Sequence, residues 1–342
     1  MTNLATPIAL TMGEPAGIGT EITLKAWLAL RNAESPFFVL HDPDYLTGAA
    51  RELSLAVPVV PISRPDEAAA AFEDGLPVMP VPLRAPVALG RPDPRNAASV
   101  VEAIRRATAL VASGEAAAVV TNPIQKAALY EIGFSFPGHT EFLEHLAGPG
   151  HRATMMLASD ELDLKVVPVS IHEPLSAAVS GMSTERIVGV ARAADAGLRR
   201  DFGVGRPRLA VAGLNPHAGE GGNMGCEEIE VIAPAIEALR REGIDARGPY
   251  SPDTMFTARS RKGYDAAVCM YHDQALIPIK TLDVDGGVNV TLGLPFVRTS
   301  PDHGTALDIA GKGLADPGSL VAAVGMAVRI AGHRARAKES HR

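Results

Sequence analysis

Three histidines follow three apolar runs in the second half of the chain. His172 comes after "KVVPVSI", His217 after "RLAVAGLNP" and His272 after "AAVCMY". In open α/β sheets ligands bind at the carboxyl ends of strands, and neutral imidazole is the commonest metal ligand in proteins. Three imidazoles with open coordination positions are typical of a catalytic metal site. The spacing alone favours such a shared site no more than it favours separate, hydrogen-bonded structural histidines.

The run "MYHDQALIPIK", residues 270–280, has the apolar density of a buried strand but carries three polar residues. His272, Asp273 and Lys280 would each lose hydration inside the protein. In one interpretation His272 is a core histidine whose hydrogen bonds are all made inside the protein, Asp273 is a helix cap and Lys280 is exposed to solvent. The other is a polar site at the end of a strand.

A lysine, an amide and an arginine recur nearby at intervals of nine residues, as Lys280, Asn289 and Arg298. These side chains are the donors that bind phosphate or carboxylate. Singly, each would be an ordinary surface residue. Because His272 lies next to them in the sequence, we expect an anion pocket.

The segment "GHTEFLEHLAG", residues 138–148, is expected to begin a helix. His139 or Thr140 would lie near the N-cap, with Glu141 and Glu144 in the first turns. These residues serve either capping alone or the binding of a phosphate at the helix N-terminus. Two other glycine-rich loops, "GIGTEI" and "AGKG", lack part of a nucleotide-binding fingerprint. A third, "GPGHRA", fits the spacing but follows an expected helix instead of a strand.

Short apolar runs alternate with helical patterns along the whole chain, with helices expected over 20–31 and 96–112. This alternation indicates an α/β protein with a largely parallel sheet. A length of 342 residues predicts two domains, because single cores rarely grow so large.

The composition excludes several classes of protein. A formal charge of −7 gives no electrostatic footprint for nucleic acid or anionic lipid, and no apolar run is long enough for a membrane helix. The two cysteines are too few for a disulfide framework, and the N-terminus lacks the basic region of a signal peptide. We therefore expect a cytoplasmic enzyme or binding protein.

Several long motifs occur in one order: "TMGEPAGIGTEI", "GHTEFL", "LNPHAGEGG", "YHDQALIPIK" and "GVNVTLGLPFVRTSPDHGTALDIAG". Over about residues 7–330 the chain closely resembles the 4-hydroxythreonine-4-phosphate dehydrogenase family. The resemblance implies an isocitrate/isopropylmalate dehydrogenase-like fold with two α/β domains flanking a central cleft. Residues 1–133 plus 305–342 would form one domain and residues 134–304 the other. It also implies a homodimer whose active site is shared between subunits.

The resemblance assigns roles to individual residues. The divalent metal ligands would be His172, His217 and His272. The contacts to the phosphorylated substrate would be His139, Thr140, Lys280, Asn289 and Arg298, with Lys280 also catalytic. The resemblance does not identify the proton acceptor, for which we nominate Asp253 in the segment "GPYSPDTMF". Similarity of residues 301–317 to the isopropylmalate dehydrogenase group implies that NAD or NADP contacts His303, Gly304, Thr305, Ala306 and Asp308.

The implied reaction is oxidation of the 3-hydroxyl of 4-phosphooxy-L-threonine to a keto acid, which loses CO₂ to give 3-amino-2-oxopropyl phosphate. Imidazole ligands favour Zn, Co or Ni over Mg, although substrate oxygens could bring Mg into the site. The alternatives are a dehydrogenase of threonate or erythronate 4-phosphate, and a non-enzymatic protein that binds a phosphorylated metabolite.

Overall fold

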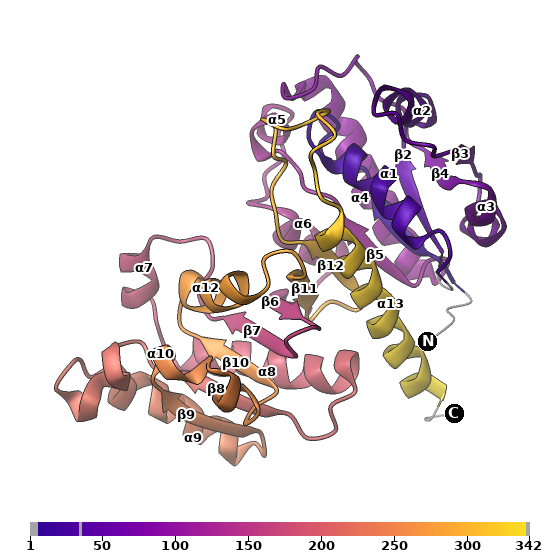
Figure 1. Cartoon of the computed structure of the whole chain (residues 1–342). Helices are drawn as coiled ribbons and strands as arrows, with labels where there is room; N and C mark the ends of the chain where they lie inside the picture. The colour runs from indigo at the N-terminus through magenta and orange to yellow at the C-terminus, as the bar shows by residue number, and fades with distance from the viewer. Residues whose placement is uncertain (1–5, 34–35, 340–342) are drawn as a thin grey trace. The chain divides into compact units, whose positions relative to one another are not determined.

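The computed structural model describes residues 6–33 and 36–339, and the chain divides into two compact units. Unit 1 comprises Met1–Ala153 and Leu294–Arg342, and unit 2 comprises Thr154–Gly293. Strands and helices alternate in both units (Figure 1), so the expected α/β class is confirmed. No helix in the described part of the chain is long and apolar enough to span a membrane.

The sheet of unit 1 runs in the order β3-β4-β2-β1-β5-β12, and each neighbouring pair is parallel. Its strands are β1 (Ile8–Thr11), β2 (Phe37–His41), β3 (Val59–Pro61), β4 (Leu76–Pro80), β5 (Ala118–Thr121) and β12 (Arg298–Pro301). The central strands β1, β2 and β5 are buried throughout, as expected for parallel strands covered on both faces.

The helices of unit 1 are α1 (Gly19–Leu30), α2 (Pro43–Glu52), α3 (Ala68–Asp74), α4 (Pro94–Ser113), α5 (Lys126–Glu131), α6 (His139–Ala147) and α13 (Gly318–Glu339), with the short 3₁₀ turn η1 (Pro65–Glu67). Local signals set the ends of α4. Asp93 accepts a hydrogen bond from the Arg95 backbone N–H, Pro94 occupies the first turn, and Gly114 ends the helix in a left-handed conformation. The helices predicted over 20–31 and 96–112 are therefore confirmed as α1 and α4.

The sheet of unit 2 runs in the order β11-β6-β7-β10-β8-β9. Its strands are β6 (Thr154–Ser159), β7 (Leu164–Pro168), β8 (Arg208–Ala212), β9 (Asp245–Tyr250), β10 (Ala266–Cys269) and β11 (Val288–Leu292). Strand β6 is antiparallel to β11 and β7, whereas β7, β10, β8 and β9 are parallel. The remaining elements are α7 (Leu175–Ser180), α8 (Thr184–Phe202), η2 (Pro216–Gly222), η3 (Glu228–Ile232), α9 (Ala233–Arg241), α10 (Pro252–Met255), α11 (Ala258–Arg261) and α12 (His272–Leu282).

The unit boundaries differ from the expected ones at 133/134 and 304/305, because α6 and β12 belong to unit 1. Phe142 and Leu143 of α6 are almost completely buried in the hydrophobic core of unit 1. Strand β12 pairs with β5, placing Arg298 opposite Val119. Packing of α6 and pairing of β12 therefore move both segments out of the domain to which we assigned them.

The interpretation of residues 270–280 as a buried strand is wrong, because α12 begins at His272. Leu276 and Ile279 are buried, whereas Ile277 is 62% exposed, which is the spacing of a helix with one buried face. Asp273 lies in the first turn, where a negative charge is favourable. The apolar density of the run hid this helical period.

Candidate functional site

The three histidines singled out by the sequence follow strands that lie side by side. His172 comes after β7, His217 after β8 and His272 after β10, and the sheet order there is β7-β10-β8 (Figure 1). All three strands are parallel, so their carboxyl ends lie at one edge of the sheet of unit 2. This is the edge at which open α/β sheets bind ligands.

His172 and His272 meet at a pocket of about 340 Å³ in unit 2, which Ser170 also lines. The centroids of the two imidazole rings are 5.8 Å apart. Nδ1 of His272 lies 2.7 Å from a carboxylate oxygen of Asp273. A carboxylate accepts hydrogen bonds, so this contact assigns the proton to Nδ1 and leaves Nε2 as the nitrogen that can bind a ligand.

Ser170 is 2% exposed, and among the described residues its hydroxyl has no hydrogen-bond partner. A buried hydroxyl without a partner is unfavourable unless a water or ligand satisfies it. Ser170 therefore marks this pocket as a place where a polar ligand would be stabilised.

His217 lies on a loop with an unusual backbone. The φ angles of His217, Ala218 and Glu220 are 52°, 51° and 42°, in the left-handed region that side chains other than glycine rarely adopt. Such a conformation costs roughly 1–2 kcal/mol per residue and persists only where surrounding contacts enforce it. The strain is concentrated in the segment that carries the candidate ligand.

Glu228 anchors the two residues that precede this loop, and nothing in the sequence singled it out. Its carboxylate, 3% exposed, accepts hydrogen bonds from the backbone N–H groups of Leu214 and Asn215 at 2.8 and 2.7 Å. It also accepts one from the Asn215 side chain at 2.9 Å. The sequence shows a cluster of glutamates after a glycine-rich loop, but the cluster alone does not reveal which glutamate is buried.

Gln274 joins the loop of His217 to the helix of His272. Its side-chain oxygen accepts a hydrogen bond from the Met270 backbone N–H at 2.7 Å, and its amide donates to the Gly213 carbonyl at 2.8 Å. The ends of β8 and β10 are thereby held together by one buried side chain.

The described residues of a single chain contain no group of three His, Cys, Asp or Glu side chains that could hold a metal ion. The structure thus brings His172 and His272 together but does not complete the expected set with His217. Two imidazoles beside a buried hydroxyl without a partner fit part of a site for a late first-row divalent cation.

The other residues expected to bind substrate fall in both units. In unit 2, Lys280 is exposed in the last turn of α12, and Asn289 lies in β11. The side-chain oxygen of Asn289 is enclosed and has no partner among the described residues. Asp253, the expected proton acceptor, is exposed at the start of α10 and accepts a hydrogen bond from the Ser251 hydroxyl at 2.7 Å.

In unit 1, the expected cap of α6 is wrong. Gly138 is the N-cap and no side chain caps the helix, so His139 and Thr140 do not serve capping. His139 is half-buried, and its Nε2 is enclosed without a partner in the described part of the chain. Burial, and then the charges of Arg298 and Lys126, hold the pKa of His139 well below its usual range, so its imidazole is neutral at pH 7.

Arg298 is 4% exposed, and its Nε and Nη2 donate to the Thr121 hydroxyl at 3.2 and 2.7 Å. Burial lowers its pKa to about 10, so the guanidinium stays charged at pH 7. Unit 1 thus fixes a buried positive charge near a neutral imidazole, an arrangement that suits an anionic ligand.

The expected cofactor residues, His303, Gly304, Thr305, Ala306 and Asp308, lie on the loop between β12 and α13. The Thr305 carbonyl accepts a hydrogen bond from the Ile18 N–H at 3.0 Å, which holds this loop against the segment before α1. Nε2 of His303 is enclosed and has no partner among the residues described. Asp308 is exposed.

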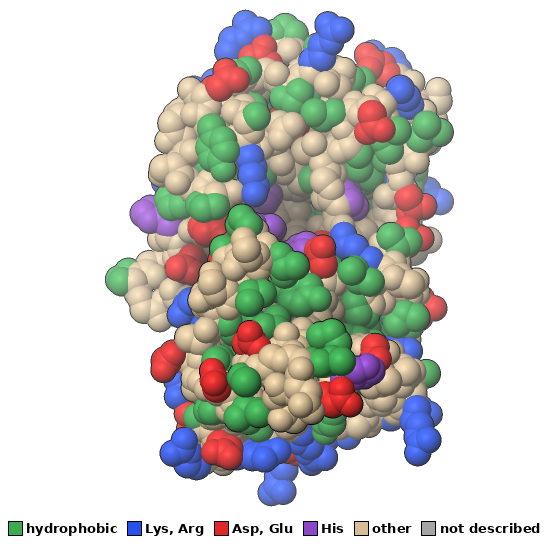
Figure 2. All heavy atoms as spheres, turned by 90° about the vertical axis from the view of Figure 1, so that its left-hand side faces the viewer, with side chains coloured by type: hydrophobic (Ala, Val, Ile, Leu, Met, Phe, Trp, Pro, Cys, Tyr) green, Lys and Arg blue, Asp and Glu red, His purple; other side chains and the backbone are tan. Residues whose placement is uncertain are grey.

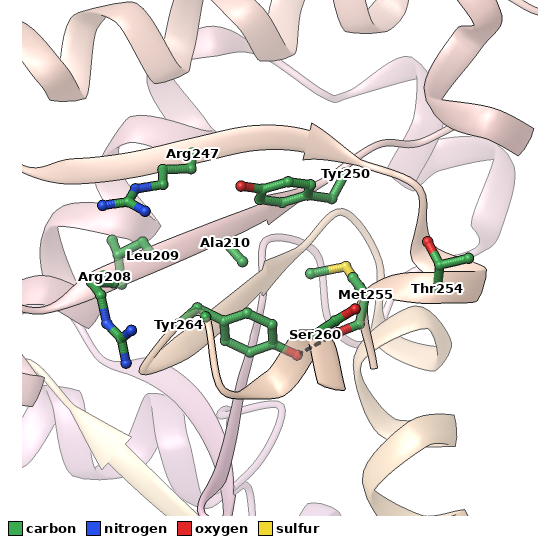
Figure 3. Close-up of a pocket in the computed structure, with 10 residues that line it drawn as sticks. Arg208, Leu209, Ala210, Arg247, Tyr250, Thr254, Met255, Ser260 and Tyr264 are labelled. Carbon is green, nitrogen blue, oxygen red and sulfur yellow. Dashed lines mark hydrogen bonds between the residues drawn. The ribbon is translucent and has the colours of Figure 1, made fainter. Parts of the chain in front are cut away.

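A different pocket of about 220 Å³ in unit 2 contains none of the expected residues (Figure 3). Its arginines are paired, Arg208 with Asp265 at 2.8 Å and Arg247 with Asp245 at 2.7 Å. The Tyr264 hydroxyl donates to the Met255 carbonyl at 3.0 Å. Because most of its polar groups are already satisfied, we assign it no function.

Comparison with known proteins identifies the family of this chain. The sequence model of the family described as pyridoxal phosphate biosynthetic protein PdxA matches residues 32–327. The chain is 51% identical over 333 residues to 4-hydroxythreonine-4-phosphate dehydrogenase of Caulobacter vibrioides, covering 96% of this chain and 98% of that protein. It is 53% identical over 345 residues to the enzyme of that name from Maricaulis maris, covering 98% of this chain and 100% of the relative.

A crystal structure of 4-hydroxythreonine-4-phosphate dehydrogenase from Klebsiella pneumoniae is similar to this chain with a TM-score of 0.86 and 39% identity, over 97% of this chain and 100% of the other. Sequence and fold therefore agree over nearly the whole length: the chain belongs to the PdxA family of pyridoxal phosphate biosynthetic proteins.

Proposed function

We propose that this protein oxidises 4-phosphooxy-L-threonine with NAD or NADP and a divalent metal ion, giving a 3-keto acid that loses CO₂ to form 3-amino-2-oxopropyl phosphate. The observation that carries the proposal is the pairing of His172 and His272 beside the buried Ser170 hydroxyl. It occurs in a chain whose relatives are named 4-hydroxythreonine-4-phosphate dehydrogenase.

In this proposal His172 and His272 hold the metal together with His217 from a second copy of the chain. A bound divalent ion supplies Lewis acidity, which eases loss of the proton from the substrate hydroxyl. Asp273 orients His272, Glu228 shapes the loop that carries His217, and Asp253 accepts the proton.

Exposed apolar side chains support the involvement of a second copy. Leu175 on α7 is 59% exposed and lines the histidine pocket, and Ile277 on α12 is 62% exposed. Figure 2 views the side on which α7 lies in Figure 1, and hydrophobic side chains are visible on this surface. Exposed large apolar residues near a functional pocket are typical of a protein interface.

The phosphate of the substrate is assigned to His139, Thr140 and Arg298 of unit 1. Lys280 and Asn289 are proposed as further contacts to the substrate. Arg298 offers a buried charge that Thr121 holds in place. His139, neutral at pH 7, offers a donor or acceptor at its enclosed Nε2 without adding a second full charge.

The cofactor is assigned to the loop of His303, Gly304, Thr305, Ala306 and Asp308. The enclosed Nε2 of His303 supports this assignment, because it lacks a partner in the part of the chain described. A carboxylate at Asp308 would accept hydrogen bonds from a free ribose 2′-hydroxyl and repel a 2′-phosphate, so NAD is expected to be preferred over NADP.

The proposal is tested by following NADH or NADPH absorbance after addition of 4-phosphooxy-L-threonine, with threonate 4-phosphate and erythronate 4-phosphate as parallel substrates. We expect the highest kcat/KM with 4-phosphooxy-L-threonine and NAD, loss of turnover with a chelator, and recovery with Zn²⁺ or Co²⁺. Higher kcat/KM with a phosphorylated sugar acid would favour that dehydrogenase instead. Binding of these compounds without any reduced cofactor would favour the non-enzymatic alternative.

A further inference from the structure

Lys126, the first residue of α5, lies beside the beginning of α6. A β-carbon placed on Gly138, the N-cap of α6, would be 3.5 Å from Cε and 3.6 Å from Nζ of Lys126. The lysine is exposed, and among the described residues its ammonium makes no hydrogen bond or ion pair. The unpaired ammonium of Lys126 therefore lies at the N-terminus of α6 without capping that helix.

The charges around this position are mainly positive. The N-terminus of α6 carries a partial positive charge and N–H groups without a capping side chain. Lys126 and Arg298 both act electrostatically on His139, the first residue of α6. Glu141 opposes them, since its Oε2 would be 3.4 Å from the same β-carbon on Gly138.

Repulsion among these positive groups would be relieved by an anion. We propose that Lys126 is a further substrate-binding residue, whose ammonium contacts the phosphate of the substrate together with Arg298 and the N-terminus of α6. The inference rests on the proposed function, because it deepens the assignment of the phosphate to His139, Thr140 and Arg298.

The two cations would have different roles. Arg298 is buried and hydrogen-bonded to Thr121, so its guanidinium has a fixed direction. Lys126 is an exposed point charge on a flexible chain, so it can follow the phosphate as substrate enters and leaves. Gly138 leaves room for this, because any side chain there would occupy the space next to the ammonium.

The test compares Lys126→Ala and Lys126→Arg with Lys262→Ala, which removes an exposed lysine from unit 2. KM and kcat are measured with the phosphorylated substrate and saturating NAD, and the Kd of inorganic phosphate is measured by calorimetry. We expect Lys126→Ala to raise both KM and Kd about tenfold, as for loss of one exposed charge-assisted hydrogen bond, with kcat within about twofold. Lys126→Arg should retain most of the affinity, and Lys262→Ala should match the wild type.

Thr140→Ala separates failure of this inference from failure of the proposed function. If Lys126→Ala leaves KM and Kd unchanged while Thr140→Ala raises both, Lys126 is not a phosphate contact and the proposed site stands. If neither variant changes either constant, the phosphate has been assigned to the wrong residues. A fall in kcat and thermal stability of Lys126→Ala, with unchanged phosphate affinity, would make the lysine structural and overturn the inference.

Discussion

Residues of one type serve different purposes in this protein according to their surroundings. His41 is completely buried, and its Nδ1 accepts a hydrogen bond from the Asp42 backbone N–H at 2.7 Å. Its ring stacks on that of Tyr45, with 5.6 Å between the ring centroids. His272 is only half-buried, faces a pocket and has one ring nitrogen held by Asp273. Burial and partners, which the sequence does not display, separate the structural histidine from the candidate ligand.

The burial of His41 predicts a pH-dependent stability. Burial lowers the pKa of His41 from 6.5 to about 4. Between pH 6.5 and about pH 4 the His41 imidazole is protonated in the unfolded chain but neutral in the folded chain. The free energy of unfolding therefore falls as the pH falls through this range. From this group alone we expect a loss of about 2 kcal/mol between pH 7.5 and pH 5.

Urea unfolding at a series of pH values measures this effect. In His41→Asn the free energy of unfolding should depend less on pH, by this amount between pH 7.5 and pH 5. The variant is also expected to be less stable than the wild type at pH 7.5. An equal slope in the variant and the wild type would mean that His41 does not cause the acid destabilisation.

At the scale of elements, the loop between β8 and α9 shows how backbone strain and a buried carboxylate act together. His217, Ala218 and Glu220 have positive φ angles, and Glu228 holds the base of their loop through hydrogen bonds from Leu214 and Asn215. We expect the loop to relax, and His217 to lose its direction, when this anchor is removed.

Glu228→Gln should therefore weaken metal binding. The amide keeps the shape of the side chain, and its one oxygen can still accept from the Leu214 and Asn215 backbone N–H groups, but its NH₂ group cannot accept the bond that the Asn215 side chain donates to the carboxylate. We expect the affinity for Zn²⁺ to fall roughly 10- to 100-fold, as for other residues that orient metal ligands, with a parallel loss of turnover. Zn²⁺ affinity is measured by competition with a chelating dye.

Glu230→Gln is the matched control, because Glu230 is exposed on the same short element, η3. Its Zn²⁺ affinity should equal that of the wild type. Wild-type affinity in Glu228→Gln as well would show that the loop holds His217 without this carboxylate.

At the scale of the molecule, the sequence predicted the α/β class and the placement of three histidines after parallel strands. It did not predict α12, because an apolar run with an internal proline has no clear period. It also misplaced α6 and β12, whose unit is decided by long-range contacts such as the pairing of Arg298 with Val119. Glu228 and Lys126 were missed because their importance comes from neighbours distant in the sequence.

We propose that the metal site is built from two copies of the chain. In one chain His172 and His272 lie together, and the described residues form no group of three ligands that includes His217. We therefore assign His172 and His272 of each site to one subunit and His217 to the other. In a two-fold dimer, two inactive variants with defects in opposite subunits restore one intact site.

The most direct measurement mixes pairs of the inactive variants His172→Ala, His217→Ala and His272→Ala, allows verified subunit exchange, and follows NADH formation. Mixtures of His217→Ala with either of the other two should regain roughly a quarter of wild-type activity, because about half the dimers are mixed and each has one intact site of two. The mixture of His172→Ala with His272→Ala should stay inactive. Recovery in that mixture, or no recovery in either mixture containing His217→Ala, would contradict the shared site.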